Sequence, residues 1–363
     1  MSTQAKIDPK EEDEEQCFAS AMQLVTGAWV PLVLNAVVRL DVLEIIAKAG
    51  PGAQLSPSEI ASQISTKNPD AAITLDRMLA LLASYSVLTC SVVDAGAGAQ
   101  YERRYGLAPV AKYLVKQQFG APLRPLLEYL LDKEMMDSWY GLEAAVLEGG
   151  TAFEKTHGAP VFKYIAKDPR LMNASNIAMT NYTDLYLTKL LDCYKGFDDV
   201  KILVDVGGAL GQALGMITSK YPNIKGINFD LPHVIERAPS YPGVEHKAGD
   251  MFESVPEGDA MFMKWILHLF DDDRCLKLLK NCYNALPDNG KLMIVESILP
   301  VNPENSDAAM KSNIQIDLLR VAMSTGPKER SEIEYQALAT KAGFKGLRFE
   351  CLVFNLWVMV LYK

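Results

Sequence analysis

One glycine-rich segment, Lys201 to Gly215, limits the possible folds of this chain more than any other stretch. It reads KILVDVGGALGQALG, and its apolar run from Ile202 to Val206 is interrupted only by Asp205. Such a run is typical of a buried parallel strand, and the following glycines permit a tight turn into a helix close to a ligand. A plain strand-to-helix connection would give the same pattern, so the residues downstream must decide.

Those downstream residues favour a sheet that binds a nucleoside. Asp230 lies 23 residues beyond Gly207 at the end of a second apolar strand, where a carboxylate can accept hydrogen bonds from both ribose hydroxyls. A third strand is expected before Gly249 to Phe252, and a fourth from Ala260 to His268, with His268 at its end. This order predicts a doubly wound sheet that binds an adenosyl group at its switch point.

Composition excludes several classes of protein. The 363 residues carry a net charge of -9 and are 49% hydrophobic, which indicates a globular chain with a sizeable core. No apolar run reaches the roughly 18 residues of a spanning helix, so no membrane association is expected. Six scattered cysteines and four histidines predict neither a disulfide framework nor a metal site. The start lacks a signal or transit peptide, and we expect a cytoplasmic protein.

The N-terminal region is expected to serve dimerisation. Residues 1–15 form an acidic leader that we expect to be disordered. The segment from Phe18 to Leu40 is helical in pattern and almost free of charge. A helix that is apolar on every side must be covered, and we expect a second copy of the chain to cover it, giving a homodimer.

Further helices and a hairpin complete this N-terminal module. Ser56 and Glu59 form a capping box, a helix is expected over 68–88, and two short strands flank an Ala/Gly-rich tip. The order indicates a winged-helix-like domain over 16–115. Its recognition-helix candidate, Thr74 to Leu88, carries little basic charge, so no nucleic-acid binding is expected.

The rest of the chain divides into a helical connector and the sheet domain. The connector, 116–195, is expected to line the substrate cleft. The sheet domain, 196–363, continues with a loop near 302–307, helices from Ala308 to Met323 and from Ser331 to Ala342, and two final strands. The predicted fold class is therefore α/β, a Rossmann-like sheet domain preceded by a mainly helical dimerisation domain.

Nearly the whole chain resembles the plant caffeate and 5-hydroxyferulate O-methyltransferases, which methylate small phenols with S-adenosylmethionine. The resemblance lies in RRYGLAPVAKYLVK, KYPNIKGINFDLPHVIERAPSYPGVEH, GDMF, KNCYNALPDNGK and GPKER. It implies a homodimer and a methyltransferase fold. It also implies a catalytic base at His268, flanked by Glu296 and Glu329. The positions that it implies for contact with S-adenosylmethionine or S-adenosylhomocysteine are Gly207, Asp230, Asp250, Met251 and Lys264.

The departures from the family pattern concentrate in the site. The glycine loop reads DVGGALG where DVGGGTG is usual, so Ala209 and Leu210 are expected to weaken cofactor binding. Leu269 follows the histidine where the family has an aspartate, and Ser324 replaces an asparagine, which puts recognition of a vicinal diol in doubt. The residues expected to line the substrate pocket are Tyr129, Leu130, Ile165, Met179, Tyr182, Trp265, Leu269, Leu319, Arg320, Met323 and Ser324.

Arg320 has two interpretations. Facing inward, its guanidinium would pair with the carboxylate of a hydroxycinnamate; facing outward, it would belong to the polar side of a helix. We favour the inward orientation. The chain retains the base of the family, while the residues around it differ. We therefore favour lactonisation of an ortho-hydroxycinnamate to a coumarin, with His268 as the base. The alternatives are ordinary methyl transfer to another phenolic hydroxyl and a catalytically silent dimer partner.

Overall fold

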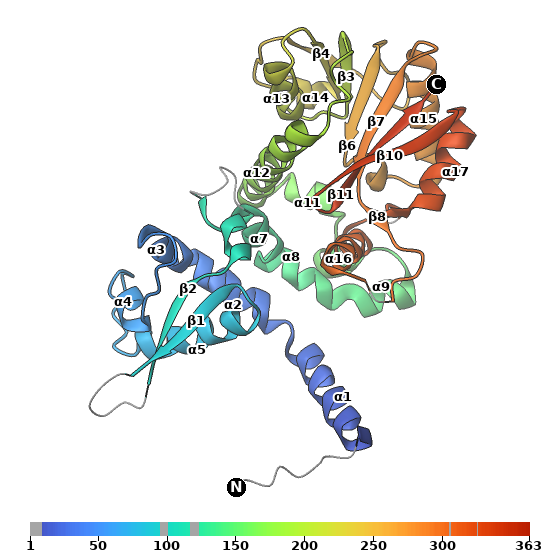
Figure 1. The fold of residues 1–363 in the computed structure, drawn as a ribbon. Coiled ribbons are helices and arrows are strands. Elements are labelled where there is room, and N and C mark those ends of the chain that lie inside the picture. The colour runs from blue at the N-terminus through green and yellow to red at the C-terminus, as the bar shows by residue number, and fades with distance from the viewer. Residues whose placement is uncertain (1–8, 95–100, 117–122, 305, 325) are drawn as a thin grey trace. The chain divides into compact units, whose positions relative to one another are not determined.

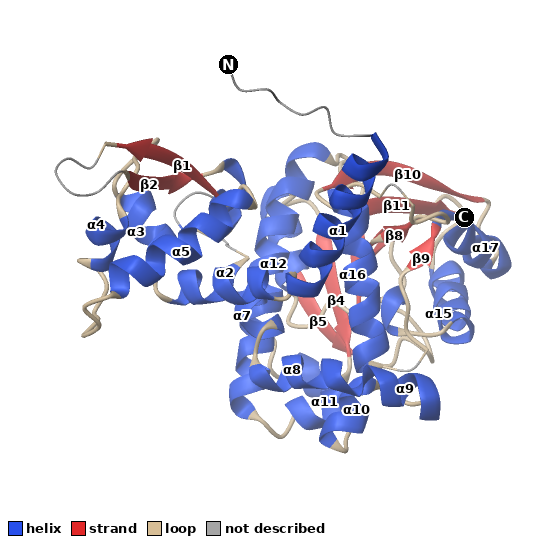
Figure 2. Cartoon of the chain, turned by 90° about the horizontal axis from the view of Figure 1, so that it is seen from below, coloured by secondary structure: helices blue, strands red, loops and turns tan. Residues whose placement is uncertain are grey.

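The computed structural model describes residues 9–94, 101–116, 123–304, 306–324 and 326–363 (Figures 1 and 2). For residues 9–12 it describes the backbone only. The chain separates into two compact units, Met1–Leu131 and Asp132–Lys363. The connector expected at 116–195 is thus divided between the two units. Each unit has its own hydrophobic core and is described by itself.

The first unit is helical with one small hairpin. The apolar faces of α2, α3 and α5 meet the hairpin in a core that includes Leu79 and Leu82. The capping box of Ser56 and Glu59 is confirmed at the start of α4, and Tyr105 donates to Asp76 to tie the hairpin to α5. The elements are α1 (Pro9–Thr26), α2 (Trp29–Arg39), α3 (Val42–Lys48), α4 (Pro57–Ala61), α5 (Ala71–Ser84), β1 (Leu88–Val93), β2 (Glu102–Leu107), η1 (Pro109–Tyr113) and α7 (Arg124–Leu130).

Two expectations for this unit need correction. Residues 1–8 of the leader lie outside the described part, but α1 begins at Pro9, so the rest of the acidic leader is helical. Acidic residues near a helix N-terminus interact favourably with its dipole, which explains the longer helix. The apolar segment Phe18 to Leu40 is also two helices, with a 50° bend at the break before Trp29. The expected Ala/Gly hairpin tip lies outside the described residues.

The apolar side chains of α1 are largely uncovered within the chain. Phe18 is 69% exposed and Leu24 is 85% exposed. Among the described helices, none is by itself long and apolar enough to cross a membrane; the bent pair Asp13–Thr26 and Trp29–Arg39 meets the requirement by length and composition alone.

The second unit is built on a mixed sheet, seven-stranded in the part of the chain that the structure describes. Its strand order is β10-β11-β7-β6-β3-β4-β5. The strands β5, β4, β3, β6 and β7 are parallel, and β11 and β10 join them antiparallel. The strands are β3 (Ile202–Val206), β4 (Lys225–Asp230), β5 (Val244–Ala248), β6 (Ala260–Lys264), β7 (Lys291–Glu296), β10 (Gly346–Val353) and β11 (Leu356–Tyr362).

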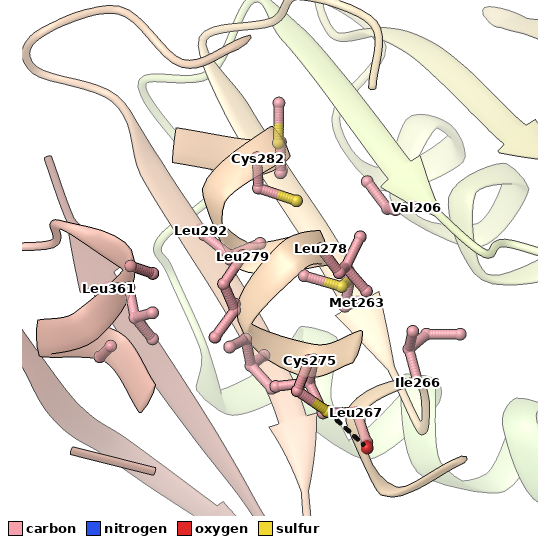
Figure 3. Close-up of a cluster of buried hydrophobic side chains, with 14 of the residues drawn as sticks. Val206, Met263, Ile266, Leu267, Cys275, Leu278, Leu279, Cys282, Leu292 and Leu361 are labelled. Atoms are coloured by element: carbon pink, nitrogen blue, oxygen red, sulfur yellow. Dashed lines mark hydrogen bonds between the residues drawn. The ribbon is translucent and has the colours of Figure 1, made fainter. Parts of the chain in front are cut away.

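Helices cover both faces of this sheet, as doubly wound folds require. Figure 3 shows α15 packed on one face, with Leu278 and Leu279 against Met263, Leu292 and other strand residues. The opposite face packs against α12 and α13. The helices are α8 (Lys133–Asp137), η2 (Ser138–Gly141), α9 (Leu142–Glu148), α10 (Ala152–His157), α11 (Val161–Ile165), α12 (Pro169–Cys193), α13 (Gln212–Lys220), α14 (Pro232–Ile235), α15 (Asp272–Ala285), α16 (Ala308–Met323) and α17 (Glu332–Ala342).

Candidate active site

The turn that follows β6 carries the expected base. The fourth strand ends at Lys264, so the expectation that His268 ends this strand is wrong. Trp265 has φ 59°, a conformation that is rare and strained for a bulky residue. The chain then enters the single turn η3, Leu267–Leu269, and His268 is 2% exposed. The sheet therefore presents the imidazole from a strained turn at its carboxyl edge.

One carboxylate holds the imidazole. Nδ1 of His268 lies 2.7 Å from Oε1 of Glu329, and an ionised carboxylate can only accept, so Nδ1 carries the proton. Ser297 donates to the other oxygen of Glu329 at 2.6 Å. Burial opposes ionisation of Glu329, but the hydrogen bonds from His268 and Ser297 and the charge of Arg320 outweigh it and lower its pKa. Glu329 therefore fixes the orientation and the tautomer of the ring.

The second expected carboxylate has a different role from the one the sequence indicated. Oε1 of Glu296 accepts from the main-chain N–H groups of Ile266 and Leu267, both at 2.8 Å. Its Oε2 is 3.4 Å from Nδ1 of His268 and has no hydrogen-bond partner among the described residues. Burial raises the pKa of Glu296. Glu296 thus holds the turn, while Glu329 orients the ring.

This arrangement leaves one nitrogen for chemistry. Because Nδ1 of His268 is bonded to Glu329, Nε2 is the atom that can take a proton from a substrate hydroxyl. The ligand atoms of His268, Glu296 and Glu329 lie within 4.8 Å of one another. A metal ion on Nδ1 would have to displace the 2.7 Å hydrogen bond, so the geometry is that of an oriented general base.

Arg320 lies beside this base. Its Nε is 3.8 Å from Oε1 of Glu329, and its side chain is 15% exposed, near the C-terminal end of α16. The inward orientation that we favoured from the sequence is therefore the one found. Nε is buried without a hydrogen-bond partner in the described part of the chain. A largely buried guanidinium with an unpartnered Nε suits an anionic group of a ligand.

An aromatic pair lies on another side of the base. The rings of Tyr182 and Trp265 stack at 4.5 Å, and Trp265 is 5.7 Å from the His268 ring. Nε1 of Trp265 is buried and has no acceptor among the described residues. These flat surfaces are suited to an aromatic substrate.

The remaining expected pocket residues are spread over both units. Ile165 is buried on α11, Met179 is partly exposed on α12, and Leu319 and Met323 lie on α16. Ser324 caps the end of α16 by donating its N–H to Arg320 O. Tyr129 and Leu130 lie on α7 in the first unit.

A cavity of about 660 Å³ opens at the carboxyl edge of the sheet beside this turn. It brings together four of the five positions expected to contact the cofactor, and Leu269 also lines it. The lining residues are Gly207, Phe229, Asp230, Leu231, Gly249, Asp250, Met251, Phe252, Ile266, Leu269, Phe270, Arg274 and Lys277.

The fifth expected position, Lys264, lies at the end of β6 rather than in the lining of this cavity. Its ammonium is 5.1 Å from the centre of the Trp265 ring. Burial lowers the pKa of Lys264 to about 8 and raises that of Asp205 to about 7. Each of these charges partly offsets the effect of burial on the pKa of the other, and the Asp205 side chain lies against the glycine turn at Gly208.

The glycine turn suits an adenosyl ligand, although the N–H of Ala209 already occupies one oxygen of Asp230. Gly207 adopts φ 73°, which strains any other residue, and a Cβ there would also approach Cδ1 of Ile266 to 2.5 Å. Ala209 adopts φ 50°, and its N–H donates to Oδ2 of Asp230 at 2.8 Å. The carboxylate expected to bind ribose therefore already accepts one hydrogen bond from the loop. Its remaining lone pairs and the adjoining cavity suit S-adenosylmethionine.

Sequence reasoning missed several residues here. Arg274 and Lys277 line the cavity, and Asp205 is buried beneath the loop. Arg330 is fully buried and bonds to the turn that carries His268. The only signal for Arg330 was its place next to Glu329 in GPKER, because a charged residue in a loop is usually solvated.

Comparisons with known proteins agree with this geometry. A family model described as an O-methyltransferase domain matches residues 139–345, and one described as an O-methyltransferase dimerisation domain matches 22–117. A caffeic acid 3-O-methyltransferase of Prunus dulcis is 52% identical over 99% of this chain and 98% of its own. An esculetin O-methyltransferase of Kitagawia praeruptora is 51% identical over the full length of both chains.

Solved structures show the same fold at lower identity. Human N-acetylserotonin methyltransferase in complex with SAM has a TM-score of 0.76 at 20% identity, covering 100% of this chain and 99% of its own. CalO1, a methyltransferase in calicheamicin biosynthesis in its SAH-bound form, has a TM-score of 0.79 at 22% identity, covering 98% and 99%. The sheet, the cavity and the sequence relatives together establish that the chain belongs to the family of plant caffeic acid O-methyltransferases, with an O-methyltransferase domain and a dimerisation domain.

Proposed function

We propose that this protein cyclises an ortho-hydroxycinnamic acid to a coumarin, using His268 as the base. The observation that carries the proposal is the pairing of a base with a cation: Arg320 lies 3.8 Å from the same Glu329 oxygen that holds His268. A substrate that carries both a phenol and a carboxylate would offer a partner to each of these groups. Leu269, in place of the usual aspartate, offers no partner to a second ring hydroxyl.

The first step is a trans-to-cis rotation of the side chain. Nε2 of His268 takes the ortho phenolic proton, and the phenoxide charge delocalises through the ring to the carboxyl group. The side-chain double bond thereby gains single-bond character, which permits rotation. Arg320 stabilises the charge that develops on the carboxyl oxygens, while Glu329 stabilises the imidazolium.

The second step closes the lactone. The phenolic oxygen forms a bond to the carboxyl carbon, and one carbon–oxygen bond of the carboxyl group breaks. The substrate binds as its carboxylate, so the departing oxygen leaves as water by taking up the proton held by His268 and one proton from solvent. The net change is the hydroxy acid to lactone plus water, and no methyl donor is consumed. Both reacting groups belong to one molecule, so the contribution of the protein is to hold the cis side chain in the geometry that closes the ring.

Methyl transfer to a phenolic hydroxyl is the second candidate function. It is favoured by the cavity of about 660 Å³ at the glycine turn and by the names of the relatives. In that reaction S-adenosylmethionine supplies an electrophilic methyl group. Gly207, Asp230, Asp250 and Met251 would hold it, and His268 would deprotonate the phenol. Binding is expected to be weaker than with an unobstructed glycine loop.

A paired incubation decides between the two functions. Purified protein is incubated with 2,4-dihydroxycinnamate and with caffeate, each with and without S-adenosylmethionine, and the products are separated by chromatography. We expect a lactone from the first acid without the donor, and little or no methylation of caffeate. Brisk donor-dependent methylation of caffeate, with no lactone above the uncatalysed rate, would refute the cyclase proposal.

Two variants sharpen this test. His268→Ala should lose on the order of 10²- to 10⁴-fold in rate of either reaction. Leu269→Asp places a carboxylate at the cavity and should depress cyclisation while raising methylation of caffeate. If Leu269→Asp leaves the ratio of the two products unchanged, residue 269 does not choose between the reactions.

A further inference from the structure

A single buried side chain, that of Arg330, holds the main chain on both sides of His268. Its Nη1 donates to the carbonyl oxygen of Leu267 at 2.9 Å, and its Nη2 donates to that of Phe270 at 2.8 Å. Its Nε donates to Asp272 at 2.9 Å. The guanidinium therefore spans the whole turn η3 and the start of α15.

The turn needs such a holder because none of the described strands pairs with it. The strand β6 ends at Lys264, and a buried carbonyl without a donor is costly. The carbonyl of Leu267 also accepts from the main-chain N–H of Phe270 at 3.2 Å and from the thiol of Cys275 at 3.1 Å, the contact drawn as a dashed line in Figure 3. A thiol is a weak donor. The planar guanidinium, with five N–H groups in a fixed fork, is the stronger and more directional clamp.

Arg330 and Glu329 are neighbours that hold the same histidine in two ways. Glu329 bonds to the ring at Nδ1, and Arg330 bonds to the carbonyls before and after the residue. The short strand β9 (Arg330–Ser331) pairs in parallel with β8 (Ile298–Leu299), which follows β7 and Ser297. This pairing fixes both neighbours relative to the end of β7, where Glu296 holds the N–H groups of the same turn.

We propose that Arg330 is a positioning residue, which aims Nε2 of His268 at the substrate hydroxyl by fixing the backbone of its turn. Nothing in its contacts requires it to touch substrate. The proposal rests on His268 being the base, which cyclisation and methyl transfer share. Displacement of a reacting group by about 1 Å can cost on the order of 10² in rate, so loosening the turn should act on turnover rather than on binding.

Arg330→Lys is the test, because it keeps the buried positive charge but removes the fork. We expect kcat for whichever product the wild type forms to fall on the order of 10²-fold, with KM within about threefold. Arg330→Ala should regain part of its kcat when guanidinium chloride is added at tens of millimolar, but not with sodium chloride at the same ionic strength. Arg103→Lys is the matched control, since Arg103 pairs with Asp76 in the first unit.

A second measurement does not depend on turnover. Proton NMR of the wild type should show a downfield signal from the Nδ1 proton between His268 and Glu329, and this signal should shift or broaden in Arg330→Lys. A kcat within threefold of wild type together with an unchanged signal would overturn the proposal. Loss of the folded state in Arg330→Lys, judged by circular dichroism, would also overturn it, because Arg330 would then serve folding alone.

Discussion

Replacing Arg320 with leucine removes the cation beside the base and should cost recognition of the substrate carboxylate. In the structure the guanidinium is largely buried, with Nε unpartnered among the described residues. A hydrogen bond to a charged group contributes about 1.5–3 kcal/mol. At 1.36 kcal/mol for each tenfold change, that corresponds to a loss of roughly 10- to 150-fold in kcat/KM for the acid.

The assay compares an acid with its ester. Lactone formation is followed by absorbance with 2,4-dihydroxycinnamate and with its methyl ester, and the dissociation constant of the acid is measured by calorimetry. For the acid, Arg320→Leu should lower kcat/KM and weaken binding, each by roughly 10- to 150-fold. For the ester, which carries no charge, the change in kcat/KM should stay within about threefold. Lys311→Leu is the control, because it removes the same charge from the exposed side of the same helix.

Two outcomes would refute the reasoning about Arg320. An equal loss with acid and ester would show that the side chain acts on the base through Glu329, whose pKa it helps to lower, rather than on the substrate. A loss below threefold with the acid, together with unchanged binding, would show that the carboxylate binds elsewhere. The calorimetric arm gives an answer even if the wild type forms only methyl ethers.

The remaining predictions concern the base, a buried acid and the dimer. Glu329→Gln keeps an acceptor for Nδ1 of His268 but removes its charge, so kcat should fall about 10- to 150-fold; an unchanged kcat would argue against imidazolium stabilisation. Asp205 has its pKa raised by burial to about 7, so the folded state holds a proton that the unfolded state releases above about pH 4. Stability should therefore fall as pH rises from about 4 to about 7, by up to about 4 kcal/mol, and urea unfolding of Asp205→Asn should lack this slope. Leu24→Glu places a charge on the exposed apolar side of α1 and should convert a homodimer to monomer in sedimentation at micromolar concentration. If Leu24→Glu sediments as the wild type does, α1 is not part of the interface.

The sequence was sufficient for the elements whose cause is local. The apolar run at Ile202 predicts β3, the capping box of Ser56 and Glu59 predicts the start of α4, and the pattern after the 302–307 loop predicts α16 from Ala308 to Met323, as found. Periodicity and capping act over a few residues, so they can be read directly from the chain. The family resemblance added His268, Glu296 and Glu329, which the fold brings within 4.8 Å of one another.

Only the tertiary structure decided what each of those groups does. From the sequence we expected the fourth strand to continue to His268, but the chain turns away at Trp265. This turn pairs with none of the described strands. Instead, Glu296 accepts from its N–H groups and Arg330 donates to its carbonyl groups. The pattern of α16 left the direction of Arg320 open, and contact with Glu329 settles it. Glu296 lies 29 residues from Leu267 in the chain, and Arg330 lies 63 residues from it. Long-range contacts of this kind leave no local pattern in the sequence.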